Sequence, residues 1–225
     1  MKIETTIIIS GGDIVDEEVK EIIYQASQKG SLFLIAADRG MECCMRLNLQ
    51  PNIVVGDFDS ISTGAYHNML WYLKKYEIPC QTLAVRKNET DTEAALHIAL
   101  EQRKSGDIIL LGGTGFRIDH MLANIAILGQ GAKLGRKIYL QDSHNRVSML
   151  FESVVLKKNQ LFGNYISLLP YAGIVTHVTL DGFSFPLTDV TLDKFSSLGI
   201  SNVLIEEEGQ ISFEDGILIC VEAKE

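Results

Sequence analysis

Several features that would place the chain in a special class of proteins are scarce or missing. The 225 residues include only four cysteines, two of them adjacent and none in a CxxC pair, so the sequence predicts neither a zinc site nor a disulfide framework. No stretch approaches the roughly 20 apolar residues of a membrane helix, and the first residues lack the pattern of a signal peptide. We therefore expect a reduced, cytoplasmic protein.

Positive charge is also scarce. The chain has 20 Lys and Arg against 29 Asp and Glu, which gives a net charge of −9. Nucleic acids and anionic membranes are bound by clustered Lys and Arg, so we expect neither as a partner. Hydrophobic residues make up 46% of the chain, which is typical of a folded globular protein with a sizeable core. This balance is compatible with a small substrate, or with an anionic substrate whose charge a metal ion offsets.

Residues 1–145 alternate between short β-branched runs and amphipathic stretches with helical spacing. This alternation predicts an α/β domain, with a mostly parallel sheet that is flanked by helices on both faces. The helix expected over 90–104 has Thr90 as its N-cap and Glu93 at capping-box distance. Trp71 falls on another amphipathic stretch, and we expect it to lie in the core.

Residues 146–225 have a different pattern. Short strand-like runs, among them 165–170 and 173–183, are separated by turn residues, and no convincing helix lies between them. The Asp-Gly pair at 215–216 is a hairpin signal. We therefore predict a second, all-β domain, a sandwich or a small barrel.

Two aspartates, Asp57 and Asp59, follow a run that is typical of a buried strand. In a parallel α/β sheet, ligands bind at the carboxyl ends of the strands. If the strand continued, both carboxylates would share one face and repel each other unless a cation lay between them. Oxygen ligands of this kind favour Mg²⁺. The alternative is a solvated turn in which Asp59 and Ser60 cap the next helix, and the two interpretations are compatible.

Further polar clusters fall where other strands end or helices begin. The segments "AADRG" (36–40) and "KNETDTE" (87–93) are two of them. Asp91 lies in the first turn of the expected helix, where the helix dipole alone would favour an acid. The turn 10–12 after the first strand is either a ligand-binding turn or a plain connection.

The segment "GGTGFRIDHMLAN" (112–124) follows another predicted strand. Its glycines let main-chain N–H groups approach phosphate oxygens, and a helix N-terminus favours anions. Arg117 would add a bidentate phosphate contact. Asp119, His120 and Asn124 each have a structural alternative: a partner for the helix dipole, an ordinary helix residue and a buried hydrogen-bonding group. The spacing is neither that of a Walker A loop nor that of a dinucleotide-binding fingerprint.

Together these motifs resemble those of thiamine pyrophosphokinases of the bacterial type. The matching patterns are "AAD.G", "P..VVGDFDSI", "K..TDTEAAL", "GGTG.R.DHMLANI" and a late "SN" followed by "G.IS...GILI". They run through almost the whole chain in the order and at the spacings of the family. Each is weak alone, and their combination is quite specific.

The resemblance implies a fold, an activity and partners. It implies an α/β catalytic domain over 1–145 that binds ATP and magnesium, and a β-sandwich over 146–225 that helps to bind thiamine. The activity would be transfer of a diphosphate from ATP to the thiamine hydroxyl, giving thiamine diphosphate and AMP. The protein would be a homodimer with active sites at the subunit interface.

The resemblance also implies roles for individual residues. Those that resemble the magnesium ligands of the family are Asp57, Asp59 and Asp91. Those that resemble its phosphate and nucleotide-site residues are Lys87, Arg117 and Asp119, with Gly113, Thr114, Gly115, His120 and Asn124 in the same motif. Ser201 and Asn202 resemble the pair that contacts the pyrimidine end of thiamine.

For such a site we expect the three metal-ligand candidates to hold one or two Mg²⁺ on the triphosphate. Lys87 and Arg117 would neutralise the charge that develops on the leaving AMP, and Asp59 or Asp119 would accept the proton of the hydroxyl. Two alternatives stay open. One is another metal-dependent diphosphokinase, or a nucleotidyl or glycosyl transferase with a DxD site. The other is a non-catalytic protein that binds thiamine or a nucleotide.

Overall fold

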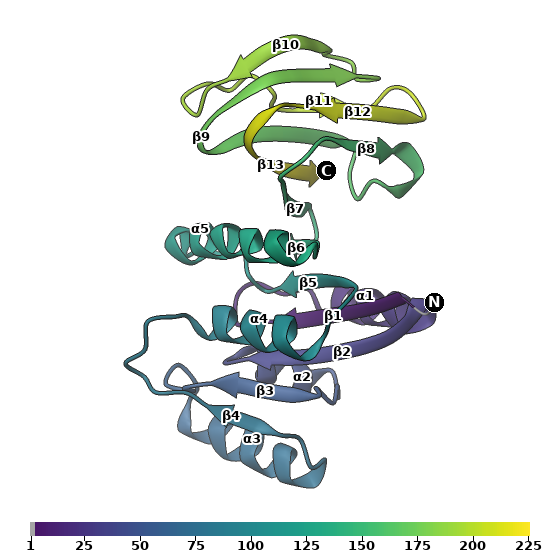
Figure 1. Ribbon diagram of the computed structural model, residues 1–225. Coiled ribbons are helices and arrows are strands. Elements are labelled where there is room, and N and C mark those ends of the chain that lie inside the picture. Colours follow the sequence, from purple (N-terminus) through teal and green to yellow (C-terminus); the bar gives the residue numbers. More distant parts are fainter. Residues whose placement is uncertain (1–2) are drawn as a thin grey trace. The chain divides into compact units, whose positions relative to one another are not determined.

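The computed structural model describes residues 3–225. The chain divides into two compact units, the first ending at Ser143 and the second running from His144 to Glu225. The sequence placed this division between residues 145 and 146. Each unit has its own apolar core, and the two are described separately (Figure 1).

The first unit is built on a sheet of six strands in the order β4-β3-β2-β1-β5-β6, and every adjacent pair is parallel. Its strands are β1 (Ile3–Ile9), β2 (Gly30–Ala37), β3 (Ile53–Gly56), β4 (Cys80–Thr82), β5 (Asp107–Leu111) and β6 (Ile138–Gln141). Its helices are α1 (Asp16–Lys29), α2 (Gly40–Arg46), α3 (Thr63–Lys75), α4 (Asp91–Gln102), α5 (Ile118–Ile127) and the 3₁₀ helix η1 (Leu128–Leu134). The predicted α/β class is therefore confirmed.

Helices cover both faces of this sheet. In Figure 1, α4 lies in front of the sheet, and α1 and α2 lie behind it. Apolar residues of α1, α2 and α3 share one core with the strands, so these three helices account for one buried layer. The predicted helices on both faces are confirmed.

One expectation about the core is wrong. Trp71 is 62% exposed, because α3 buries the face formed by Met69, Tyr72 and Leu73, which are spaced by three and four residues. Trp71 lies between these positions on the solvent side. The Nζ atom of Lys75 lies 4.9 Å from its ring centre, a typical cation–π contact.

The strand order reverses between β1 and β5. The chain adds β2, β3 and β4 on one side of β1, and then crosses back to place β5 and β6 on the other side. The connections that leave β1 and β5 therefore run in opposite directions along the sheet, which makes this position a topological switch point. In open α/β sheets this switch point is where ligands bind.

The second unit is antiparallel throughout its described strand pairs. Its strands are β7 (Asn145–Leu150), β8 (Val154–Lys157), β9 (Tyr165–Asp181), β10 (Leu187–Leu192), β11 (Asn202–Val203), β12 (Glu208–Ser212) and β13 (Asp215–Ala223), with one short 3₁₀ helix η2 (Lys158–Gln160). The long strand β9 pairs with β13 and β11 in one sheet and with β10 and β12 in the other. A separate apolar cluster fills this unit, and the predicted all-β class is confirmed.

Within residues 3–225, no helix has both the length and the apolar character that crossing a bilayer requires.

Candidate functional site

Two loops meet at the switch point of the first unit. The N–H of Gly12 donates to the carbonyl of Gly112 at 2.8 Å, and the N–H of Asp13 donates to the carbonyl of Thr114 at 3.1 Å. A Cβ atom on Gly12 would lie 2.2 Å from the Thr114 carbonyl oxygen, so only glycine allows the loops to come this close. The turn after the first strand is thus joined to the glycine-rich turn after β5.

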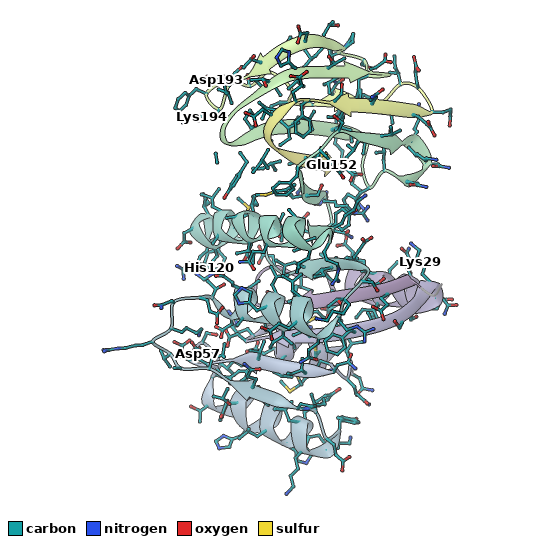
Figure 2. All side chains as sticks on the ribbon, viewed as in Figure 1. Lys29, Asp57, His120, Glu152, Asp193 and Lys194 are labelled. Atoms are coloured by element: carbon teal, nitrogen blue, oxygen red, sulfur yellow. The ribbon has the colours of Figure 1, made fainter. Side chains whose placement is uncertain are left out.

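A cavity of about 370 Å³ opens beside these joined loops. That volume is in the range of small-ligand sites, roughly 300 to 1,000 Å³. The sequence-predicted residues that line it are Asp91, Gly113, Thr114, Gly115, Arg117, His120 and Asn124. Figure 2 shows Asp57 and His120 on the side of the first unit where the strands end, and Lys29, which precedes β2, on the opposite side.

The glycine-rich turn is stabilised by the side chain of Asn124. Its side chain is buried in α5, and Nδ2 donates to the carbonyl of Gly113 at 2.7 Å. Gly112 and Gly115 have φ values of 65° and 146°, which residues with a side chain rarely adopt. Asn124 therefore fixes the shape of the turn. The sequence assigned its amide to ligand binding, whereas in the structure this amide is bonded to the turn.

Arg117 and Asp119 form a bidentate pair at the start of α5. The Arg117 Nε and Nη2 atoms donate to the two carboxylate oxygens of Asp119 at 3.1 and 2.6 Å, and both side chains are mostly exposed. These hydrogen bonds lower the pKa of Asp119 to about 2. Asp119 is absent from the residues that line the cavity, whereas Arg117 is among them. Asp119 thus restrains the guanidinium at the rim.

The acidic pair that follows β3 adopts a turn. The strand ends at Gly56, and Phe58 has a φ of 59°, so the condition that the strand continues through Asp59 is not met. Phe58 is only 6% exposed and packs in the core near Tyr66. The Asp59 N–H donates to Asp57 Oδ1 at 3.2 Å, which folds the turn back on itself.

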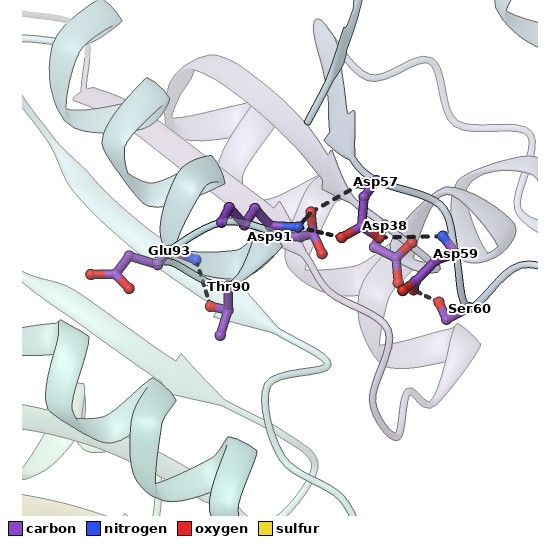
Figure 3. A network of polar contacts seen from close by, with 8 residues as sticks. Asp38, Asp57, Asp59, Ser60, Thr90, Asp91 and Glu93 are labelled. Atoms are coloured by element: carbon purple, nitrogen blue, oxygen red, sulfur yellow. Dashed lines mark hydrogen bonds and ion pairs between the residues drawn. The ribbon is translucent and has the colours of Figure 1, made fainter. Parts of the chain in front are cut away.

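Lys87 joins the acidic turn to the start of α4 by pairing with Asp57 and Asp91, two residues that Figure 3 labels. Its Nζ atom forms an ion pair with Asp57 Oδ2 and lies 3.1 Å from Asp91 Oδ1, which also accepts the main-chain N–H of Asp57 at 3.2 Å. Burial raises the pKa of Asp57, but the hydrogen bonds from Lys87 and from Asp59 outweigh it and the net pKa is lowered. Burial lowers the pKa of Lys87, but its bonds to the two aspartates raise it overall. The structure therefore brings three predicted site residues into one network.

Thr90 and Glu93 set the start of α4. Thr90 Oγ1 accepts the N–H of Glu93 at 3.1 Å, so the predicted N-cap is confirmed. The Glu93 carboxylate accepts a hydrogen bond from Gln130 Nε2 at 2.8 Å, which directs it toward η1. This cap fixes Asp91 in the first turn of the helix, at the end of the cavity.

Sequence reasoning assigned no role to Asp38, although it noted the cluster around it. Asp38 follows β2, has a φ of 47° and lines the cavity. The Ser60 hydroxyl donates to its Oδ2 at 2.5 Å, whereas its buried Oδ1 has no hydrogen-bond partner among residues 3–225. Burial raises the pKa of Asp38, and the carboxylates of Asp91 and Asp57 add to this rise. The signal in the sequence was its position at the end of a parallel strand.

The acidic side chains of this region offer only oxygen ligands, which suits Mg²⁺. They belong to Asp38, Asp57, Asp59 and Asp91. In the part of the chain that the structure describes, no three Asp, Glu, His or Cys side chains are arranged as a ready metal site, and Lys87 pairs with both Asp57 and Asp91. The unpartnered Asp38 Oδ1 nevertheless indicates that the cluster lacks a positive or donating group. The donor chemistry therefore fits a magnesium ion that would share the carboxylates with Lys87.

The two residues assigned to the second substrate lie in the second unit. Ser201 is exposed, has a φ of 57° and donates its N–H to Ser167 Oγ at 3.0 Å. Asn202, the first residue of β11, is only 3% exposed, and its amide bonds to the main chain of Phe185. Direct contact of these two side chains with a ligand stays a prediction.

Comparison with family models identifies both units. Residues 24–140 match the model described as "Thiamin pyrophosphokinase, catalytic domain", and residues 153–218 match "Thiamin pyrophosphokinase, vitamin B1 binding domain". The chain is 35% identical over 188 residues to the thiamine pyrophosphokinase of Bacillus subtilis, covering 83% of this chain and 85% of that protein.

Solved structures agree with this match. The crystal structure of thiamine pyrophosphokinase from Bacillus subtilis is 30% identical with a TM-score of 0.83, and covers 99% of both chains. The Geobacillus thermodenitrificans enzyme is 27% identical with a TM-score of 0.82, covering 99% of this chain and 98% of that one. Yeast thiamin pyrophosphokinase, at 16% identity and a TM-score of 0.76, shares the fold over 99% of this chain and 86% of its own.

Proposed function

The chain belongs to the thiamine pyrophosphokinase family, and we propose that it transfers a diphosphate group from ATP to the hydroxyl of thiamine, giving thiamine diphosphate and AMP. The observation that carries this proposal is the cavity at the switch point of the first unit, which is lined both by a glycine-rich turn and by the carboxylates of Asp38 and Asp91. The turn suits phosphates and the carboxylates suit a cation, as transfer from a metal-bound nucleotide requires.

The triphosphate of ATP would bind against the turn Gly113–Gly115 and the first turn of α5. Main-chain N–H groups and the positive end of the helix dipole favour anions there, and the side chain of the N-cap residue Arg117 makes no capping hydrogen bond. Arg117 lines the cavity and is held by Asp119, so its guanidinium is partly oriented before the nucleotide arrives. His120 lies on the same wall.

Magnesium would be held by Asp57, Asp59 and Asp91, and we add Asp38 to this set because its Oδ1 is buried without a partner in residues 3–225. The bound ion would offset negative charge on the phosphate oxygens. Lys87 bridges two of these carboxylates and would supply a second positive charge toward the leaving AMP.

The thiamine hydroxyl would attack the β-phosphorus in line. Transfer to phosphorus depends on positioning more than on a strong base, so the residue that accepts the proton contributes modestly. Of the two candidates, Asp119 has a pKa lowered to about 2 by Arg117, which makes it a weak base at neutral pH. Asp59 is the other candidate for this role.

Three further properties belong to the proposal. The second unit would bind thiamine near Ser201 and Asn202, as its match to the vitamin B1 binding model supports. A homodimer with active sites at the interface follows from the family resemblance and is testable by light scattering. A reducing, cytoplasmic location is supported by four cysteines that form no disulfide.

The direct test is to incubate the purified protein with Mg-ATP and thiamine and to quantify products. We expect AMP and thiamine diphosphate in equal amounts. Pyrophosphate or a nucleoside diphosphate as product would indicate one of the other transferases, and thiamine binding without AMP would indicate a non-catalytic protein. The family matches do not favour either alternative.

A pair of matched variants tests the assignment of the acidic turn. Asp57→Asn preserves the size of the side chain and removes its charge, so we expect kcat to fall by about 100-fold or more while the fold is retained. Asp107→Asn makes the same change at the opposite, amino end of β5, and we expect it to leave turnover unchanged. Normal turnover of Asp57→Asn at ordinary magnesium concentrations would refute the metal assignment.

A further inference from the structure

The turn 10–12 that follows β1 lines the cavity, but two of its main-chain donors are used within the protein. The N–H of Ser10 donates to the carbonyl of Leu111 at 2.8 Å, and the N–H of Gly12 is bonded to Gly112. These bonds hold β1 and its turn to the end of β5. The polar side chain of the turn is the Ser10 hydroxyl, because the other two residues are glycines.

The Ser10 hydroxyl is bonded to a second hydroxyl. Ser10 Oγ lies 2.9 Å from Thr92 Oγ1, and both residues line the cavity. Thr92 lies in the first turn of α4, directly after Asp91. A threonine in a helix can bond its hydroxyl to a carbonyl three or four residues earlier. Here the hydroxyl meets Ser10 instead, so it is directed away from its own helix and toward the end of β1.

Burial sets the direction of this hydrogen bond. A hydroxyl has one hydrogen, so one member of the pair donates and the other keeps its hydrogen for a third group. Ser10 is 3% exposed, whereas Thr92 is half-buried. A buried hydroxyl hydrogen without an acceptor is costly. Ser10 therefore donates to Thr92, and the hydrogen of the Thr92 hydroxyl is available to the cavity.

We propose that the Thr92 hydroxyl binds the nucleotide by donating to a non-bridging oxygen of the diphosphate that is transferred, and that Ser10 is a positioning residue that acts through Thr92. This inference rests on the proposed function. Thr92 follows the candidate metal ligand Asp91, and metal ions in phosphoryl transfer bridge the β- and γ-phosphates. A donor beside Asp91 is thus placed to reach the same two phosphates.

The donor is fixed before the nucleotide arrives. The Thr90 cap sets the first turn of α4, and the main chain of Ser10 is bonded to β5, so neither partner has to be ordered on binding. A hydroxyl is also neutral. It adds a hydrogen bond to a charged phosphate oxygen without repelling a cation that the nearby carboxylates would hold, as a further lysine or arginine would.

Thr92→Val tests the contact, because valine has a similar shape and lacks the hydroxyl. We expect the Kd for Mg-ATP, measured by isothermal titration calorimetry without thiamine, to rise by about tenfold. The Kd for AMP, which lacks the transferred diphosphate, should be unchanged. Thr191→Val makes the same replacement at an exposed position of β10 and should change neither value. An unchanged Kd for Mg-ATP in Thr92→Val, or an equal loss for AMP, would overturn the proposal.

Thr92→Ser is the conservative variant. It keeps a hydroxyl beside Ser10, so we expect it to retain most of the affinity for Mg-ATP. If Thr92→Ser bound Mg-ATP as weakly as Thr92→Val, the hydroxyl would not be the group that matters.

A double-mutant cycle tests the role of Ser10. Ser10→Ala leaves Thr92 its hydroxyl but removes the group that orients it, so we expect the Kd for Mg-ATP to rise by about threefold. The double variant should bind Mg-ATP no more weakly than Thr92→Val alone, because Ser10 then has no hydroxyl to orient. Effects that multiply independently would overturn the positioning role.

Urea unfolding of the same variants separates a donor from a simple tie between β1 and α4. Thr92→Val leaves the buried Ser10 hydroxyl without a partner, whereas the double variant removes both, so the double variant should be at least as stable as Thr92→Val. Lower stability with an unchanged Kd for Mg-ATP would show a tie alone. A wild-type protein that binds Mg-ATP but makes no AMP with thiamine would instead refute the proposed function, so the two failures are distinguishable.

Discussion

Replacing Lys87 by alanine should destabilise the first unit through the carboxylates it leaves behind. The Lys87 side chain is 15% exposed, and those of Asp57 and Asp91 are 8% and 19% exposed, so the network is largely shielded from water. At an effective dielectric constant of about 20, unit charges separated by the 3.1 Å between Lys87 Nζ and Asp91 Oδ1 attract by about 5 kcal/mol, before the desolvation of both groups.

The loss of unfolding free energy in Lys87→Ala lies between two limits. Exposed ion pairs contribute about 0.2 to 1 kcal/mol, whereas removal of one partner from a buried pair costs about 3 to 5 kcal/mol. Because this network is partly buried, we expect Lys87→Ala to lower the free energy of unfolding by about 2 to 3 kcal/mol at pH 7 without magnesium. The measurement is urea unfolding followed by circular dichroism.

The pH dependence of this loss follows from the lowered pKa of Asp57. A carboxylate whose pKa is lowered by folding contributes stability above the unfolded pKa, about 3.9, and loses it as the pH falls through the folded value. In the variant the neighbouring carboxylates raise one another's pKa. The difference in stability between wild type and Lys87→Ala should therefore narrow as the pH falls below about 4.

Magnesium provides a second measurement on the same variant. If the carboxylates are metal ligands, removal of the competing ammonium should let Mg²⁺ stabilise Lys87→Ala more than it stabilises the wild type. Saturation at about 100 times Kd adds about 2.7 kcal/mol. Arg46→Ala is the control, because it breaks an exposed pair with Asp16 and should cost less than about 1 kcal/mol, without a response to magnesium. A variant as stable as the wild type, or one indifferent to pH and magnesium, would refute this account of the network.

Three further changes give clear expectations. Gly12→Ala would bring a Cβ atom to 2.2 Å from the Thr114 carbonyl oxygen, so we expect a loss of about 1 to 3 kcal/mol in chemical denaturation and a raised KM for ATP. Asn124→Ala leaves a buried carbonyl unpaired and should cost about 1 to 3 kcal/mol, again with a raised KM for ATP; an unchanged KM would contradict its support of the turn. The hydrogen bond to Asp189 raises the pKa of His177, so its stabilising contribution is full at low pH and is lost as the pH rises through the folded pKa. The difference in unfolding free energy between wild type and His177→Gln should therefore be larger at about pH 5 than at about pH 9, and a pH-independent difference would show that the ion pair is not responsible.

Much of the first unit was predictable because its signals are local. Apolar strands, helical spacing and the Thr90 cap each depend on residues close together in the chain, and the structure confirms them. Trp71 was misplaced because a helix that buries a narrow stripe leaves the adjacent position exposed, and hydrophobicity alone does not show which stripe is buried.

The second unit shows where local signals fail. Residues 165–170 and 173–183 were expected as separate strands, because Pro170 and Gly173 resemble turn residues. They belong instead to the single strand β9, in which Ala172 and His177 have positive φ values and bend the chain. A bulged strand absorbs such residues, and only its pairing with β13 on one side and β12 on the other reveals that it is continuous.

The candidate site was predictable as a set of residues and unpredictable as a set of contacts. The order of the strands brings Asp38, at the end of β2, beside the turn after β3, and no pattern along the chain encodes that order. In the same way, the sequence placed Asn124 and Asn202 in ligand-binding motifs, whereas in the structure each amide holds a main-chain segment. A motif therefore predicts which residues belong to the site. Whether an amide or a carboxylate binds the main chain or a ligand depends on which groups lie within hydrogen-bond distance, and the motif does not show this.

The pair Asp57 and Asp59 alone did not specify a ligand site in the sequence, because it is Asp91 that connects this pair to the cavity. It lines the cavity with the glycine-rich turn, and it also accepts the N–H of Asp57 and pairs with Lys87. It is therefore the residue through which the acidic turn and the nucleotide cavity share one electrostatic environment. A cation bound by the acidic turn, and phosphates bound by the glycine-rich turn, would each change the charge that Asp91 experiences, so binding of either should favour binding of the other.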